Sequence, residues 1–254
     1  MVIALILIAP FVFCAESKIS DHKLLVLTEQ LYPMNYTKNG DDDGKILGFS
    51  TELVIAILEE ANLEYEISMV PWARAIHSIN KNKNVLVYSM TRSIGRKDTY
   101  HWIGDIWEGK INLYGHRDRL KAWPLALAEI KKLKVGASRG SVSSNHLESN
   151  GFDNIVTTKS IDNYMKLLER GRIDLFPHLG FSVNMVADRL GFDKTKLISV
   201  LELSAISPNL ALAAGKNTDV KIVKRLRLAY KKIKQSSRYD EIMAPLKVMI
   251  DDLH

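Results

Sequence analysis

The chain of 254 residues has almost no cysteine: Cys14 is the only one, and it lies within the apolar N-terminal segment. Disulfides and cysteine metal sites are therefore excluded from the part of the chain that follows. The apolar segment itself, residues 1–15, is short for a membrane-spanning helix, which needs about 20 apolar residues. It has the length of a signal-peptide core instead.

A long basic run is also missing. The net charge is +6 and the pI about 9.2, but the lysines and arginines are scattered along the sequence. Arms that bind nucleic acid concentrate their positive charge, so no nucleic-acid partner is expected. The excess charge favours anionic ligands only weakly, through the general field of the protein.

Motifs for catalysis and for metal binding are absent as well. The sequence has no G-x-S-x-G, no H-E-x-x-H, no P-loop and no dinucleotide fingerprint, and its seven histidines are scattered. Asp41, Asp42 and Asp43 are consecutive, so they lack the alternating spacing of a calcium loop. We therefore expect neither an enzyme nor a resident metal or cofactor.

The N-terminal segment predicts export. Residues 1–15 are read as a signal peptide, although no lysine or arginine precedes the apolar run. Acylation of Cys14 as a lipoprotein is the alternative. Phe13 argues against it, because a small residue is expected before an acylated cysteine.

What the sequence does contain is ordinary for a folded protein, with 46% hydrophobic and 25% charged residues. The length suits one large domain or two lobes of about 100 residues each. Apolar periodicity predicts two successive β-α-β-α-β series, which favour mostly parallel sheets flanked by helices. The expected strands of the first series are 23–28, 65–70 and 85–88, with helices at 50–61 and 73–80; those of the second are 134–138, 155–157 and 173–176, with helices at 142–150, 161–170 and 182–190.

The segment Ser89–Arg96 stands out for its chemistry. It directly follows the apolar strand 85–88 and contains hydroxyls, backbone amides and two guanidinium groups. Ligands of open α/β sheets bind beyond the carboxyl ends of the strands, and an arginine fork there holds a carboxylate through two hydrogen bonds. The sequence predicts an anion site at this point, against the alternative of a solvated loop.

The order of landmarks resembles the extracytoplasmic solute-binding proteins of the polar amino-acid type, family 3, which serve ABC importers. The landmarks are Tyr32-Pro33, Gly48–Leu53, Trp72, Met90-Thr91, Arg96, Gly140-Ser141, Gly171–Asp174 and the C-terminal helices. Pro71–Ala75 further resembles a divergent subgroup with a Pro-Trp-x-Arg-Ala signature.

This resemblance implies a type II periplasmic binding fold with two lobes and a two-strand hinge. Lobe one would comprise residues 20–113 and 209–254, and lobe two residues 114–208. A small-molecule ligand, a periplasmic location, a membrane permease or receptor as partner and a monomeric state are implied with it.

The resemblance also implies a ligand site. Arg96 would grip the ligand's carboxylate, Ser89 and Thr91 would add hydrogen bonds, and Tyr32 or Trp72 would cover its side chain. Arg139, Gly140 and Ser141 would contribute from lobe two at a helix start. Arg74 and Arg92 are further candidates, with pairing to Glu52 or Asp105 as their alternative, and His178 is a candidate contact.

One position departs from the family pattern. Amino-acid binders of this family commonly carry an aspartate for the ligand's ammonium where this chain has Leu179. His178 is a poor replacement near neutral pH, and a buried ammonium without a partner is costly. An acidic or neutral ligand, or an amino acid held in another way, is therefore considered beside an ordinary amino acid. A soluble sensor for a membrane receptor and a dehydratase acting on a cyclic carboxylate through His178 and Arg96 remain as alternative functions.

Overall fold

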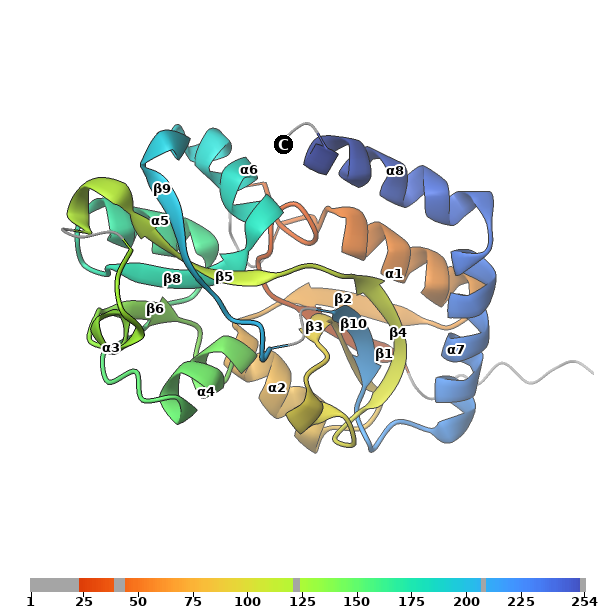
Figure 1. Cartoon of the computed structure of the whole chain (residues 1–254). Helices are drawn as coiled ribbons and strands as arrows, with labels where there is room; N and C mark the ends of the chain where they lie inside the picture. Colours follow the sequence, from red (N-terminus) through yellow and green to blue (C-terminus); the bar gives the residue numbers. More distant parts are fainter. Residues whose placement is uncertain (1–22, 39–43, 121–123, 207–208, 252–254) are drawn as a thin grey trace, which may run out of the picture.

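The protein is built on two separate five-stranded sheets. The computed structural model describes residues 23–38, 44–120, 124–206 and 209–251. The strand order is β2-β1-β3-β10-β4 in the first sheet and β7-β6-β8-β5-β9 in the second. In each, three strands run parallel, and the other two are antiparallel to their neighbours. The predicted α/β architecture with two lobes is confirmed (Figure 1).

The first lobe contains the first sheet and the helices around it. Its strands are β1 (Leu24–Thr28), β2 (Tyr65–Met69), β3 (Val85–Thr91), β4 (His101–Trp107) and β10 (Leu210–Ala214), and its helices are α1 (Phe49–Glu60), α2 (Trp72–Lys81), α7 (Val220–Lys234) and α8 (Ser237–Asp251). Alternate apolar residues form the sheet, and α1 buries Leu53, Val54, Ile57 and Leu58.

The second lobe repeats this plan. Its strands are β5 (Ile111–His116), β6 (Val135–Ala137), β7 (Ile155–Thr157), β8 (Leu175–Leu179) and β9 (Leu197–Glu202), and its helices are α3 (Leu127–Ile130), α4 (Val142–Ser149), α5 (Ile161–Glu169) and α6 (Gly180–Leu190). The predicted lobe limit at residue 113 falls inside β5, which pairs only with β8 and β9. The second sheet therefore starts at Ile111.

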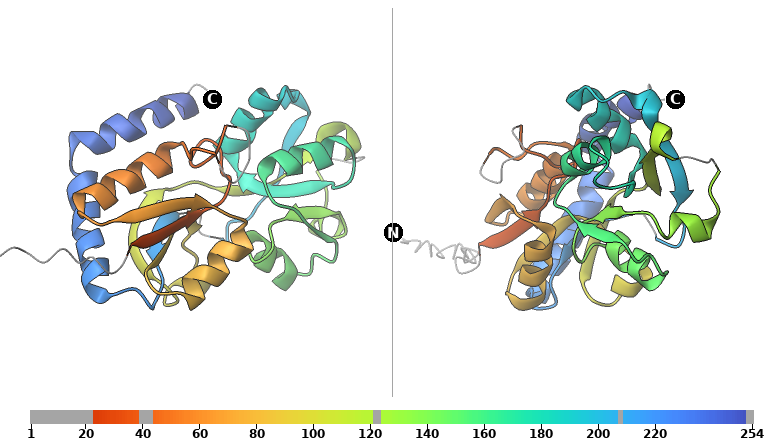
Figure 2. Two further views of the ribbon diagram at one scale, coloured as in Figure 1. Left: turned by 180° about the vertical axis from the view of Figure 1, so that it is seen from behind. Right: turned by 90° about the vertical axis from the view of Figure 1, so that its left-hand side faces the viewer.

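The chain crosses between the sheets twice, from β4 to β5 and from β9 to β10. The two crossings touch, because the amide of Leu203 donates to the carbonyl of Ile111 at 2.8 Å. Figure 2 shows the lobes side by side from behind, with the crossing segments between them. Two adjacent segments joining two lobes are the arrangement from which hinge closure arises.

Two strands extend further than predicted, and both extensions carry site residues. β3 continues through Thr91 because β10 pairs with it, with Leu210 opposite Thr91. β8 continues past Phe176 to Leu179 and contains Pro177. The proline lacks an N–H, but β6 pairs with β8 only at Leu175, so no bond to that side is lost.

One predicted helix start is wrong. The sequence predicts Ser50 as the N-cap of the helix over 50–61, but the helix begins at Phe49, with Gly48 as its cap residue and no side-chain bond. The hydroxyl of Ser50 is buried without a hydrogen-bond partner. Its amide is already satisfied by the carbonyl of Met34 at 2.8 Å, since the 31–36 loop folds back onto the helix start.

The described residues contain neither a membrane-spanning helix nor a cluster of metal ligands. None of their helices combines the length and apolar character needed to cross a bilayer. Among the same residues, no three His, Cys, Asp or Glu side chains are grouped as metal ligands. The predicted signal peptide at residues 1–15 and Cys14 lie outside the described residues.

Candidate functional site

A cavity of about 110 Å³ lies between the two lobes. Its first-lobe wall comes from the ends of β1 and β3 and from the start of α2, and its second-lobe wall from the ends of β6 and β8 and the starts of α4 and α5. Carboxyl ends of parallel strands therefore meet there from both sheets. The cavity is many times the roughly 10–15 Å³ that one water molecule needs, which gives room for a small solute.

Arg96 is the main cation of this cavity. It lies at the end of a 3₁₀ turn, Ile94–Arg96, just after β3. Its Nη2 donates to the carbonyl oxygen of Gly140, in the second lobe, at 3.0 Å. Its Nη1 is buried and has no hydrogen-bond partner among the described residues. Burial lowers the pKa of Arg96, while Tyr100 and Glu29 act in the opposite direction.

Trp72 joins the two lobes beside Arg96. Its side chain is buried at the start of α2, with 7% of its surface exposed, and lines the cavity. The indole Nε1 also donates to the Gly140 carbonyl, at 3.3 Å, and the Arg96 guanidinium lies 5.6 Å from its ring centroid. Gly140 has a φ of 69°, which favours glycine and turns its carbonyl toward the first lobe.

Ser89 and Thr91 line the cavity. Ser89 has a φ of 54°, an uncommon conformation for a residue with a side chain. Its Oγ donates to Oδ1 of the buried Asn35 at 2.5 Å. Asn35 in turn donates to Thr28 Oγ1 at 2.8 Å, so a buried polar network supports this end of the sheet.

Glu29 is a cavity residue that the sequence interpretation missed. It lies directly after β1 and is half-buried. Burial raises the pKa of its carboxyl group from 4.5 to about 8, and the charge of Arg96 limits the increase. The cavity therefore contains one acid, contributed by the first lobe, beside its arginine. A detectable signal was present, because Glu29 follows a strand of the same sheet edge as Ser89.

The second-lobe wall is made mainly of hydroxyl groups and helix starts. Ser141 is the N-cap of α4, and its Oγ accepts from the amide of Ser144 at 3.0 Å. Ser138 follows β6, and its Oγ lies 3.0 Å from the hydroxyl of Tyr164, which stacks on Phe176. Ser138, Tyr164, Lys159 and Ser160 all line the cavity and were missed by the sequence interpretation.

The comparisons with known proteins give the family. The profile of a family described as bacterial extracellular solute-binding proteins, family 3, matches residues 24–245. The chain belongs to this family. No curated protein is significantly similar in sequence.

Solved structures resemble this family 3 protein in fold. An ancestral arginine-binding protein bound to arginine superposes with a TM-score of 0.72 at 20% identity, covering 88% of this chain and 97% of the other. A histidine kinase sensor domain similar to periplasmic binding proteins gives 0.74 at 18% identity, with 88% and 95% covered. An amino acid ABC transporter substrate-binding protein from Streptococcus pneumoniae, bound to L-arginine, gives 0.69 at 17%, with 90% and 94% covered.

Five predicted contacts do not line the central cavity of this family 3 protein. One is Gly140, whose carbonyl binds Arg96 and Trp72 at its border. Arg74 is exposed on α2, because α2 buries Trp72 and Ala75 and position 74 falls on the other face. Arg92 is exposed too, 3.4 Å from Asp105, the alternative partner considered above. Arg139 lines a neighbouring cavity of about 190 Å³. Tyr32 lines a larger neighbouring chamber.

His178 and Leu179 do lie at the cavity. Burial lowers the pKa of His178 to about 4, so its ring is neutral near pH 7. Its ring lies 6.5 Å from that of Tyr164. Leu179 is buried where the family commonly has an aspartate, and so the second lobe provides no carboxylate at that point.

Proposed function

We propose that this protein captures a small carboxylate-bearing solute, an amino acid or a related organic acid, by closing its lobes over it, and delivers it to an ABC importer. The observation that carries the proposal is the unpaired Nη1 of Arg96 at a cavity bounded by both lobes. A buried donor without a partner costs about 1–3 kcal/mol, or more when it is charged. A carboxylate oxygen would remove that cost.

Closure of the two lobes would couple ligand binding to a change in the protein's conformation. Only the closed form surrounds a ligand with Arg96 and Ser89 on one side and the second-lobe hydroxyls on the other. A solute that touches both walls binds that form better, and so it shifts the balance between the open and closed states. An importer then has a distinct shape to recognise.

Glu29 changes the expectation for amino acids. Leu179 leaves the second lobe without an acidic partner, but Glu29 places a carboxyl group at the same cavity as Arg96. A ligand ammonium beside Glu29 would favour the ionised carboxylate and lower its raised pKa. A zwitterion held between Arg96 and Glu29 is therefore compatible with the cavity, alongside simple organic acids.

A thermal-shift screen tests the proposal. The panel consists of amino acids, their deaminated acids and the corresponding amines without a carboxylate. Carboxylates should raise the melting temperature, because ligands that bind only the native state stabilise it. If the amines stabilise the protein and no carboxylate does, the proposed anchoring by Arg96 is wrong.

A sensor role is the second candidate function. The histidine kinase sensor domain described above supports it, because its fold is as similar as that of the transport proteins. Solute uptake in cells lacking the gene separates the two roles. An importer component predicts loss of uptake, whereas a sensor predicts normal uptake and a lost transcriptional response.

The enzyme alternative, a dehydratase acting on a cyclic carboxylate, uses the same cavity. Arg96 and His178 both line it, and a neutral His178 has the form needed to accept a proton. Mass spectrometry of a cyclic carboxylate after incubation with the protein decides between turnover and binding. Recovery of the unchanged compound excludes the dehydratase for that substrate.

A further inference from the structure

A second and larger chamber adjoins the central cavity. Its volume is about 520 Å³, and it shares Glu29, Gln30, Lys159, Ser160 and Ile161 with the lining of the central cavity. The two spaces thus lie on either side of the same residues. A ligand that extends from Arg96 into the second chamber would pass these shared residues.

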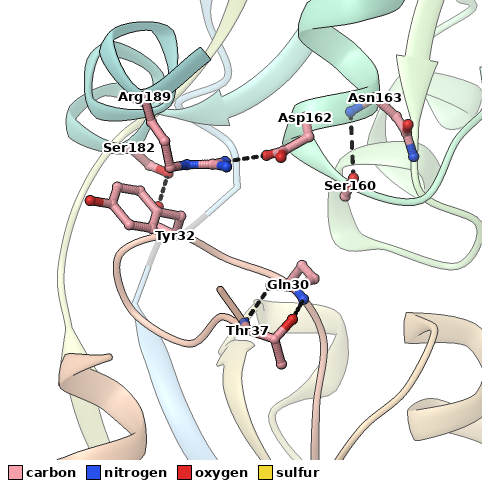
Figure 3. Close-up of polar contacts among 8 residues, drawn as sticks. All are labelled: Gln30, Tyr32, Thr37, Ser160, Asp162, Asn163, Ser182 and Arg189. Carbon is pink, nitrogen blue, oxygen red and sulfur yellow. Dashed lines mark hydrogen bonds and ion pairs between the residues drawn. The ribbon is translucent and has the colours of Figure 1, made fainter. Parts of the chain in front are cut away.

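Contacts between the lobes frame this chamber (Figure 3). Ser182 in α6 donates to the backbone carbonyl of Tyr32, and the Arg189 guanidinium lies 5.1 Å from the centroid of the Tyr32 ring. Arg189 also pairs with Asp162 in α5 at 2.5 Å. One side of the chamber is therefore formed by contacts between the two lobes, and it includes the aromatic ring of Tyr32 from the first lobe.

The charge remaining in the chamber is positive. Asp162 is neutralised by Arg189, and the other acid, Glu29, lies at the passage to the central cavity. Lys159 and Lys166 line the chamber as well, and neither takes part in an ion pair among the described residues. Lys159 lies just before the first turn of α5, whose free amides add a partial positive charge, and Lys166 lies in the last turn of the same helix.

We infer that the second chamber is a subsite for a second anionic group, so that the preferred solute is an elongated molecule with an acid at each end. The first carboxylate lies on Arg96 and the second between Lys159 and Lys166, with the connecting chain passing Ser160. This inference rests on the proposed function, because it needs the first carboxylate at Arg96.

Calorimetric titration with two series of probes tests the subsite. One series is the straight-chain dicarboxylates from succinate to suberate, and the other is the monocarboxylates of the same lengths, from butyrate to octanoate. One dicarboxylate should bind about tenfold more tightly than its matched monocarboxylate, since two partly exposed ammonium groups together contribute about that much. The advantage should depend on chain length, because both ends must reach their partners.

The variant Lys159→Gln/Lys166→Gln should abolish the advantage of the dicarboxylate over its matched monocarboxylate. Lys159 also lines the central cavity, so the two series are compared within the same variant. Both lysines are exposed, so the fold does not depend on them. The matched control is Lys132→Gln/Lys134→Gln, which removes the same charge from an exposed part of the second lobe away from the chamber and should keep the advantage.

The outcomes separate this inference from the proposed function. Equal affinities for both series, or an advantage that survives in the Lys159/Lys166 variant, overturn the subsite and leave carboxylate capture intact. If the control variant loses the advantage to the same extent, the effect comes from the overall positive charge of the protein. That outcome also overturns the subsite. Failure of every carboxylate in both series overturns the proposed function, and the subsite with it.

Discussion

The two walls of the central cavity differ in chemical character. The first lobe contributes an arginine and an acid, Arg96 and Glu29, on the ends of its strands. The second lobe contributes hydroxyl groups, a neutral histidine and Leu179, and its one cation in the cavity lining is Lys159. In the proposed binding role, the charged groups of the central cavity would therefore come mainly from the first lobe, and the second lobe would mainly enclose the solute there.

The largest expected effect is that of removing the charge from the first wall. Arg96→Ala should weaken carboxylate binding by about a hundredfold, roughly 3 kcal/mol, since charge-assisted hydrogen bonds are lost. Isothermal titration with the best ligand of the screen measures it. Arg92→Ala is the control, because Arg92 is exposed, pairs with Asp105 and does not line the cavity. Similar losses in both variants would mean that Arg96 has no special role.

Glu29, the acidic residue of the first-lobe wall, should affect the binding of amino acids only. Glu29→Gln should weaken binding of an amino acid by about tenfold and leave its deaminated counterpart unaffected, because only the former has an ammonium group. Paired titrations with the two compounds measure the difference. Equal changes for both would show that the ammonium lies elsewhere.

Glu29 should also affect the pH dependence of stability. Its pKa in the folded protein is about 8, above its ordinary value of 4.5, so the folded state binds the extra proton between these values. The free energy of unfolding should therefore fall as pH rises from 4.5 to about 8. Thermal melts of Glu29→Gln across this window should lack that contribution. A slope identical to that of the unmodified protein contradicts the raised pKa.

A smaller effect is expected where the second wall meets Trp72. Trp72→Phe removes the indole donor to Gly140 and should weaken ligand binding by about threefold to tenfold, because closure loses a hydrogen bond. Trp102→Phe is the matched control, since Trp102 is also buried but its indole bonds to Lys97 within the first lobe. Trp102→Phe should lower the melting temperature without changing the affinity.

The smallest effect is expected for the neutral histidine of the second wall. His178→Gln should change the affinity by no more than about threefold, because it replaces one neutral hydrogen-bonding group by another. The substitution should also leave the pH dependence of the affinity between pH 6.5 and 8 unchanged, because His178 is uncharged throughout that range. A loss of affinity as large as that of Arg96→Ala would instead show that the second-lobe wall contributes as much to ligand recognition as the first-lobe wall.

The fold was largely predictable because its signals are local. Alternating apolar residues and helix periodicity depend on the chain itself, and most elements lie within a few residues of their predicted bounds. β3 and β8 were predicted too short because their ends are stabilised by partner strands distant in sequence, such as β10. The missed helix cap at Ser50 has the same origin, since the 31–36 loop supplies the competing contact.

The site was predictable only in part. Arg96, Ser89, Thr91, Trp72, Ser141 and His178 line the cavity because strand ends and helix starts point into it. Arg74 lies on the outer face of α2, which helical phase alone could have shown. Lys159 and Ser160 precede α5 as Ser141 precedes α4, so the same helix-start signal could have indicated them.

The carbonyl of Gly140 accepts hydrogen bonds from both Trp72 and Arg96, so one nitrogen of the guanidinium already has a backbone oxygen of the second lobe as its partner. A carboxylate that binds Arg96 would have to share the guanidinium with this carbonyl or displace it. In the proposed function, we expect this competition to hold the affinity below what a free arginine would give. A moderate affinity would suit a carrier, which has to release its solute as readily as it binds it.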